Sequence, residues 1–165
     1  MSRLVATFFY VGLLRPAPGT WASAVAIVLG LAIDRALGFP ALVMATVAAA
    51  GWGFWACEME LRDRPGADPS EVVIDEIAGQ WLTLLFPAAA FWQRGLEDWA
   101  IAAYPGWIGA FLFFRLFDIW KPGPVGRADR RGDPAGVMLD DLWAGLFAGL
   151  AVMVAAGIAH GVILR

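Results

Sequence analysis

Charged residues are scarce in this chain and make up only 16% of its 165 residues, against about 25% in an ordinary soluble domain. It has one cysteine, which excludes a scaffold held together by disulfides within the chain. Bases are outnumbered by acids, 12 against 15, and no basic tract occurs, so we expect no nucleic-acid partner. Apolar residues dominate instead: 60% of the chain is hydrophobic and the mean hydropathy is +0.66. The composition predicts a small integral membrane protein with a single domain, residues 1–165.

Five runs without a charged residue predict the spanning helices: 16–33, 36–57, 77–92, 99–114 and 142–164. A helix needs about 17–25 residues to cross a bilayer, which the second and fifth runs supply outright and the others approach. Thr20 is expected to cap the first helix, and Pro87 to kink or end the third. Residues 1–14 are apolar but too short to span. We expect an all-α membrane bundle of about five spans, with an additional short interfacial or re-entrant helix at the N-terminus.

The distribution of bases predicts the orientation of this bundle. Five spans would place nine Arg and Lys residues on one side of the membrane and three on the other. The excess marks the first side as cytoplasmic. The nine are Arg3, Arg15, Arg62, Arg64, Arg115, Lys121, Arg127, Arg130 and Arg131.

Four polar groups border the apolar runs, all at the ends predicted to face the cytoplasm. Because span parity brings them to one side and one depth, residues far apart in the sequence are expected to meet. Ionisable groups beside membrane spans are costly, and by default they indicate a functional site. The groups are the segment 15–20, Asp75 with Glu76, Arg115 with Asp118 and Lys121, and Asp140 with Asp141.

The acidic members of these groups predict a metal site. Five carboxylates at one depth would repel one another unless a cation lay among them. No histidine or cysteine lies near these motifs, so only oxygen ligands are available, which favours Mg²⁺, Mn²⁺ or Ca²⁺ over zinc. The residues expected to bind the metal and to act in catalysis are Asp75, Glu76, Asp118, Asp140 and Asp141.

The basic members predict a phosphate site beside the metal. Arg115, Asp118 and Lys121 stand at i, i+3 and i+6, roughly along one helix face, so two cations and one carboxylate could point into one pocket. Thr20 follows Pro18 and Gly19 at a predicted helix start, where backbone N–H groups and a hydroxyl can hold an anion. Carboxylates that hold Mg²⁺ next to Arg and Lys are typical of phosphate chemistry.

Each group also has a simpler interpretation. Arg115 and Asp118 have the spacing of an intrahelical salt bridge, and segment 16–20 is a common turn and cap. The acidic pairs lie near helix starts, where the helix dipole favours negative charge. Asp129 and Asp133 are most simply solvated loop charges.

Four motifs carry a resemblance to a known family: RPAPGTWAS (15–23), VVIDEIAGQW (72–81), FFRLFDIWKPGPV (113–125) and GVMLDDLWAG (136–145). In order, spacing and chain length the sequence resembles phosphatidylglycerophosphatase A. The resemblance implies a helical bacterial inner-membrane enzyme that uses Mg²⁺ to convert phosphatidylglycerophosphate, a phospholipid, into phosphatidylglycerol and inorganic phosphate. It assigns the same five carboxylates to metal binding and catalysis, and Arg115, Lys121 and Thr20 to the substrate phosphate. The chain departs from the family at 130–135, where a glycine-rich stretch is usual.

Two alternatives stay open at this stage. One is a non-enzymatic membrane protein, such as a small transporter subunit that binds an ion. This alternative predicts charges near the membrane midplane, whereas those found here collect at one interface. The other is a phosphatase that acts on a different lipid phosphate.

Overall fold

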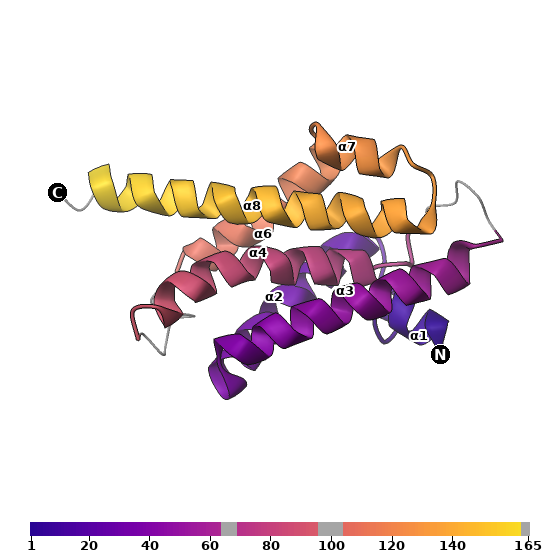
Figure 1. Ribbon diagram of the computed structural model, residues 1–165, viewed down its shortest axis with the longest axis horizontal. Coiled ribbons are helices and arrows are strands. Elements are labelled where there is room, and N and C mark those ends of the chain that lie inside the picture. The colour runs from indigo at the N-terminus through magenta and orange to yellow at the C-terminus, as the bar shows by residue number, and fades with distance from the viewer. Residues whose placement is uncertain (64–68, 96–103, 163–165) are drawn as a thin grey trace.

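The computed structural model describes residues 1–63, 69–95 and 104–162, the last three through their backbone alone. Within these ranges the chain is helical and contains no strand, so the predicted all-α class is confirmed. The elements are α1 (Ser2–Ala6), a short 3₁₀ helix η1 (Val11–Leu13), α2 (Pro18–Leu37), α3 (Phe39–Leu61), α4 (Ile74–Trp92), α6 (Gly106–Trp120), α7 (Pro124–Asp129) and α8 (Pro134–Val162) (Figure 1).

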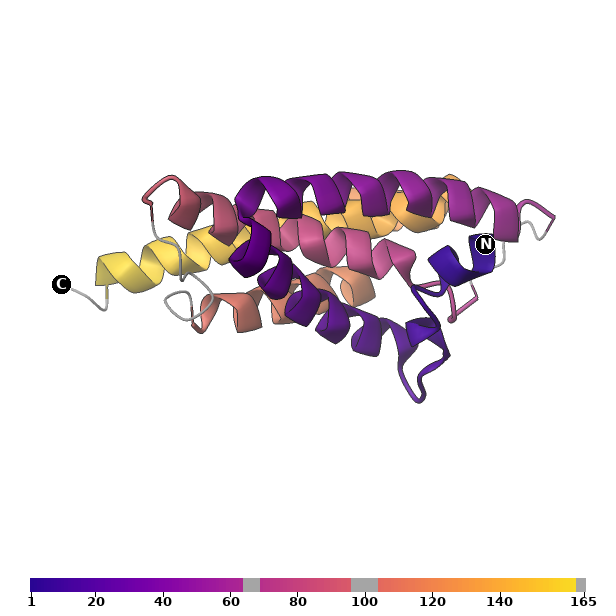
Figure 2. The ribbon, with the colours of Figure 1, turned by 90° about the horizontal axis from the view of Figure 1, so that it is seen from below.

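Helix α4 is the centre of the bundle. It packs against α2, α3, α6 and α8 (Figure 2), and Figure 1 shows it running along the long axis between α8 and α3. Most of its residues are buried, among them Ile77, Trp81 and Leu84, whereas Trp92 at its C-terminal end is exposed. A hydrogen bond of 2.8 Å from the indole Nε1 of Trp81 to the carbonyl of Ala26 ties α4 to α2.

Helices α4 and α8 approach each other closely because the residues at their contact, Gly79 and Gly145, have no side chains. A Cβ added at Gly145 would collide with the carbonyl oxygen of Gly79, and one added at Gly79 would lie 2.5 Å from the carbonyl of Asp141. The hydroxyl of Thr83 hydrogen-bonds to the carbonyls of Gly79 and Gly145, at 3.0 and 3.1 Å. Small residues and a buried hydroxyl at a crossing are typical of helices that pack inside membranes.

Large apolar side chains cover the outside of the bundle. They include Val28 on α2, Met44 on α3, Ile119 on α6 and Val154 on α8, each more than half exposed. In the described part of the chain, three segments are long and apolar enough to cross a membrane: α2, α3 and Pro134–Ala159 of α8. The other two predicted spans correspond to α4, with 19 residues, and α6, with 15. Residues 99–103 of the fourth run lie outside the described part of the chain. Five spans therefore stay a prediction.

The expected start of the first helix is wrong, and one of the two alternatives for Pro87 is excluded. Helix α2 begins at Pro18 rather than at Thr20, because the fixed φ of proline suits the first helical position. Thr20 then lies in the first turn instead of capping it. Pro87 is predicted to kink or end the third helix, and it does not end it, since α4 continues to Trp92; the kink stays a prediction.

The N-terminal segment forms two short pieces instead of one helix. Helix α1 is followed by three left-handed residues, Phe8, Phe9 and Tyr10, and then by η1. The carbonyl of Ala6 accepts a 2.8 Å hydrogen bond from the N–H of Val73, the residue before α4. This bond fastens the N-terminal segment beside the first turn of α4.

Candidate active site

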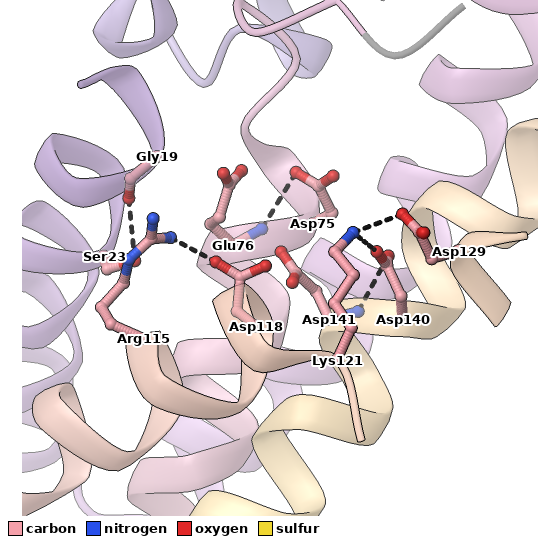
Figure 3. A network of polar contacts seen from close by, with 10 residues as sticks. All are labelled: Gly19, Ser23, Asp75, Glu76, Arg115, Asp118, Lys121, Asp129, Asp140 and Asp141. Atoms are coloured by element: carbon pink, nitrogen blue, oxygen red, sulfur yellow. Dashed lines mark hydrogen bonds and ion pairs between the residues drawn. The ribbon is translucent and has the colours of Figure 1, made fainter. Parts of the chain in front are cut away.

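One pocket collects every residue that the sequence analysis assigned to a site. It has a volume of about 330 Å³ and lies where the first turns of α2 and α4 and the N-terminal part of α8 meet the C-terminal end of α6. Figure 3 shows the charged side chains pointing toward one another from these helices. Its lining includes Thr20, Asp75, Glu76, Arg115, Asp118, Lys121, Asp140 and Asp141. The structure therefore brings these residues together, while their roles stay predictions.

Three of the five carboxylates lie close enough to share one ion. Asp75, Glu76 and Asp141 each offer an oxygen, and these three oxygens lie within 4.8 Å of one another. Asp75 and Asp141 are buried. Asp75 precedes Gly79 by one helical turn, and Asp141 precedes Gly145 by one turn, so the close α4–α8 contact also brings the two carboxylates together.

The other two carboxylates pair with the cations. Oδ2 of Asp118 lies 2.6 Å from Nη1 of Arg115, at the i, i+3 spacing of one helix face. Oδ2 of Asp140 lies 2.7 Å from Nζ of Lys121 and joins α8 to the end of α6. Both pairs are largely buried. The simpler interpretation of Arg115 and Asp118 as a salt bridge thus describes a real contact, but one that lies inside the pocket.

Gly19 lets the backbone of α2 approach the charged groups. A Cβ at this position would collide with Oε1 of Glu76 and lie 3.2 Å from Nη1 of Arg115. Figure 3 shows Gly19 above the guanidinium of Arg115 and beside Glu76. The motif at 15–23 therefore contributes a helix start whose backbone at Gly19 can lie directly against Glu76 and Arg115.

Several buried polar atoms have no hydrogen-bond partner among the described residues. They are Oε2 of Glu76, Nε of Arg115 and both polar atoms of the Gln80 carboxamide. Buried polar groups are normally paired, so such atoms call for an explanation. The Glu76 and Arg115 atoms lie at the pocket, where a bound cation and a bound anion would satisfy them.

Asp129 and Asp133, expected to be solvated loop charges, both line the pocket. Asp129 forms an ion pair with Lys121. Burial opposes the charge on Lys121, yet hydrogen bonds to Asp129 and Asp140 raise its pKa above the ordinary value, so the ammonium stays charged at neutral pH. Both side chains are nonetheless well exposed, at 39% for Asp129 and 44% for Asp133, so the prediction of solvated charges is confirmed. The placement in a loop is wrong for Asp129, which is the last residue of α7.

Asp133 also shapes the start of α8. Its Oδ1 accepts a 2.6 Å hydrogen bond from the N–H of Gly136, and Arg131 forms an ion pair with its carboxylate at 2.8 Å. The hydrogen bonds from Arg131 lower the pKa of Asp133. The Asp133–Pro134 pair is the sequence signal for this cap, because Asp and then Pro are favoured at a helix start.

The fold and the pocket can now be set beside known proteins. The family model described as phosphatidylglycerophosphatase A matches residues 4–156. The chain belongs to the phosphatidylglycerophosphatase A family. The resemblance noted in the four motifs is thereby confirmed.

Two relatives match over most of their length. A phosphatidylglycerophosphatase A from Haemophilus influenzae is 32% identical over 90% of this chain and 85% of its own. A Bacteroides thetaiotaomicron protein that carries the provisional name phosphatidylinositol-3-phosphatase is 35% identical over 92% of this chain and 91% of its own. No solved structure matches.

Membership of this family makes the chain an enzyme of the lipid phosphatase type. The alternative of a non-enzymatic, ion-binding transporter subunit is therefore set aside. The pocket agrees with this assignment. The transporter alternative predicts charges near the membrane midplane, whereas the charges of the pocket gather at the helix ends.

Proposed function

We propose that this protein hydrolyses the terminal phosphomonoester of phosphatidylglycerophosphate to phosphatidylglycerol and inorganic phosphate, with Mg²⁺ as cofactor. One observation carries the proposal. Three carboxylates whose oxygens lie within 4.8 Å of one another share a single pocket with Arg115 and Lys121. A cation site next to phosphate anchors is the equipment that phosphomonoester hydrolysis needs.

The residues at the centre of the pocket fit Mg²⁺. Asp75, Glu76 and Asp141 offer only oxygen, the ligand that Mg²⁺ prefers, and Oε2 of Glu76 is buried without a partner. Three carboxylates this close would repel one another without a cation between them. We therefore assign these three residues to the metal, and Asp118 and Asp140 to the cations they contact. Mg²⁺ bound there supplies Lewis acidity for the attack of water on phosphorus.

The phosphate would lie between α6 and the start of α2. Arg115 has a buried Nε without a partner, and it can donate from this atom to a phosphate oxygen. The first N–H groups of α2, at Gly19 and Thr20, have no partner within the helix, and a helix start favours an anion. Asp118 and Asp140 fix the two cations and so hold the anchors in place before the substrate arrives.

The same site has a proposed place in the cell. We propose that the chain crosses the inner membrane of a bacterium five times, with the pocket at the cytoplasmic face. Support comes from the nine bases that five spans would place on one side, among them the pocket residues Arg115 and Lys121. Of the nine, Arg64 lies outside the described residues.

A phosphate on a different lipid is the second candidate substrate. The relative that carries the provisional name phosphatidylinositol-3-phosphatase is 35% identical over 92% of this chain, so family membership leaves the headgroup open. The anchors recognise a phosphomonoester, and they would do so on either lipid.

Phosphate release from purified protein in detergent micelles tests the proposal. The substrates are phosphatidylglycerophosphate, phosphatidate and phosphatidylinositol 3-phosphate, each with Mg²⁺ and with a chelator. We expect Mg²⁺-dependent release, fastest from phosphatidylglycerophosphate, none from the Asp141→Ala variant, and weaker release from Asp140→Ala, which loosens Lys121. Asp63→Asn, which changes an exposed carboxylate outside the pocket, is the matched control and keeps full activity. Chelator-resistant release or near-normal turnover by both alanine variants would overturn the proposal, and faster release from another lipid would reassign the substrate.

A further inference from the structure

Lys121 is held by a residue that the proposed function does not use. We propose that Asp129 is a positioning residue: it holds the ammonium of Lys121 at the pocket and thereby sets the affinity for the substrate phosphate. The proposal rests on the proposed function, because that function assigns Lys121 to the phosphate.

The backbone of Lys121 is fixed by its neighbours. The residue ends α6 in a left-handed conformation with φ of 50°, and its N–H donates a 2.8 Å hydrogen bond to the carbonyl of Phe117. A Cβ added at Gly126 would lie 2.5 Å from the carbonyl oxygen of Lys121, so α7 packs directly on this peptide. The fixed backbone therefore also fixes the position of the Cβ of Lys121, from which the side chain extends.

The end of the side chain lies between two carboxylates. Nζ is 2.7 Å from Oδ2 of Asp140 and also contacts Oδ1 of Asp129 (Figure 3). The side chain of Asp140 is 10% exposed and that of Asp129 is 39% exposed, so one carboxylate lies deep in the pocket and the other at its mouth. An ammonium has three N–H donors, and these contacts leave one for a ligand.

Asp129 is not carried by a loose loop. It is the last residue of α7, in which Val125, Gly126 and Ala128 are buried. A Cβ at Gly136 would lie 2.7 Å from the carbonyl of Ala128, which shows how closely α7 packs on α8. An ordinary surface ion pair contributes little, partly because two long side chains must be ordered. Here the packing of α7 fixes the backbone of Asp129, and Asp129 is a short side chain, so less has to be ordered.

This arrangement predicts what Asp129 does for binding. With Asp140 as its only partner, the ammonium would be drawn toward the deep carboxylate and away from the mouth. Asp129 balances that pull, so the free N–H stays where a phosphate would enter. Loss of Asp129 should therefore weaken substrate binding and leave the chemical step nearly unchanged.

Steady-state kinetics of the full chain in detergent micelles, with phosphatidylglycerophosphate as substrate, test the proposal. We expect Asp129→Ala to raise KM about tenfold, the size of a charged hydrogen bond, with kcat within about twofold. Asp129→Asn keeps an oxygen that can accept from Lys121, so its KM should lie between those of Asp129→Ala and the unchanged chain. In a Lys121→Met background, Asp129→Ala should add nothing, because the two residues act as one unit.

Asp63→Asn is the control, since it removes an exposed carboxylate far from either partner in the sequence. An unchanged or lower KM for Asp129→Ala, or the same rise in the Lys121→Met background, would overturn the proposal. Thermal midpoints show whether the variants fold, and if Asp129→Ala does not, the KM of Asp129→Asn decides. Failure of the proposed function looks different, because the unchanged chain would then release no phosphate from this lipid.

Discussion

Gly79 and Gly145 lie against each other where α4 crosses α8, so that a Cβ on Gly145 would collide with the carbonyl oxygen of Gly79. Each glycine stands four residues after a carboxylate of the pocket, Asp75 on α4 and Asp141 on α8. On each helix the carboxylate therefore lies one turn before the glycine at the crossing. The distance between the helices therefore determines the distance between the two proposed metal ligands.

Gly145→Ala tests this dependence. The added methyl would push α8 away from α4, which we expect to cost about 1–3 kcal/mol of stability, as overpacking usually does. It should also separate Asp75 from Asp141 and raise the Mg²⁺ concentration needed for half-maximal activity. Gly157→Ala on the same helix is the control, since a Cβ there meets nothing within 4 Å. Thermal melts and Mg²⁺ titrations of both variants are the measurements, and equal results would contradict the prediction.

The carboxylates should divide into two kinetic classes. Glu76→Gln removes a proposed metal ligand, so the half-saturating Mg²⁺ concentration should rise by about tenfold or more. Asp118→Asn leaves the three proposed metal ligands intact but loosens Arg115, so the KM for lipid should rise about tenfold at an unchanged Mg²⁺ requirement. Activity measured over a grid of Mg²⁺ and lipid concentrations separates the two effects. If both variants shift the same parameter, the division is wrong.

Gly19→Ala should damage the site while sparing the fold. Alanine is normally better than glycine in a helix by about 1 kcal/mol, so stability alone would favour the change. The new Cβ would displace Glu76 and Arg115, however, and we expect kcat/KM to fall at least about tenfold. The control is Gly51→Ala on α3, where the Cβ meets nothing within 4 Å. That variant should be as active as the unchanged chain.

Gln80→Leu should stabilise the protein. The carboxamide is fully buried one helical turn beyond Glu76, and neither of its polar atoms hydrogen-bonds within the described residues. An unpaired buried polar group costs about 1–3 kcal/mol, and leucine removes that cost at similar volume. Thr83→Val is the contrasting variant, since it deletes hydrogen bonds to Gly79 and Gly145 and should lower the thermal midpoint. A lower midpoint for Gln80→Leu would show that its carboxamide is satisfied after all.

The gathering of the site residues could be predicted from the sequence, because it depends only on which helix end each charge occupies. Five predicted spans in alternating directions would put Asp75, Asp118 and Asp140 at one end of the bundle, and the pocket does bring these three residues together. The helical class followed in the same way from apolar runs of helical length. These predictions use order along the chain, and the chain order is fully known from the sequence.

Details that depend on contact between helices could not be predicted. Which carboxylate faces a metal and which faces a cation depends on side-chain directions within one pocket. Asp129 looks like a loop charge until the short helix α7 is seen to pack on α8. Pro87 lacks an N–H and therefore suggests a kink or a helix end, yet α4 continues past it, and Pro87 is buried in the bundle.

The exposed apolar surface has a kinetic consequence. Trp21 directly follows Thr20, and Trp120 directly precedes Lys121. Both tryptophans are exposed, and both of their neighbours line the pocket. Apolar surface thus continues to the edge of the pocket, so a lipid can present its phosphate there while its acyl chains stay among other lipids. Encounter between enzyme and substrate then takes place in two dimensions. The rate should follow the mole fraction of substrate within the micelle or bilayer, and adding inert detergent at constant bulk substrate should slow the reaction.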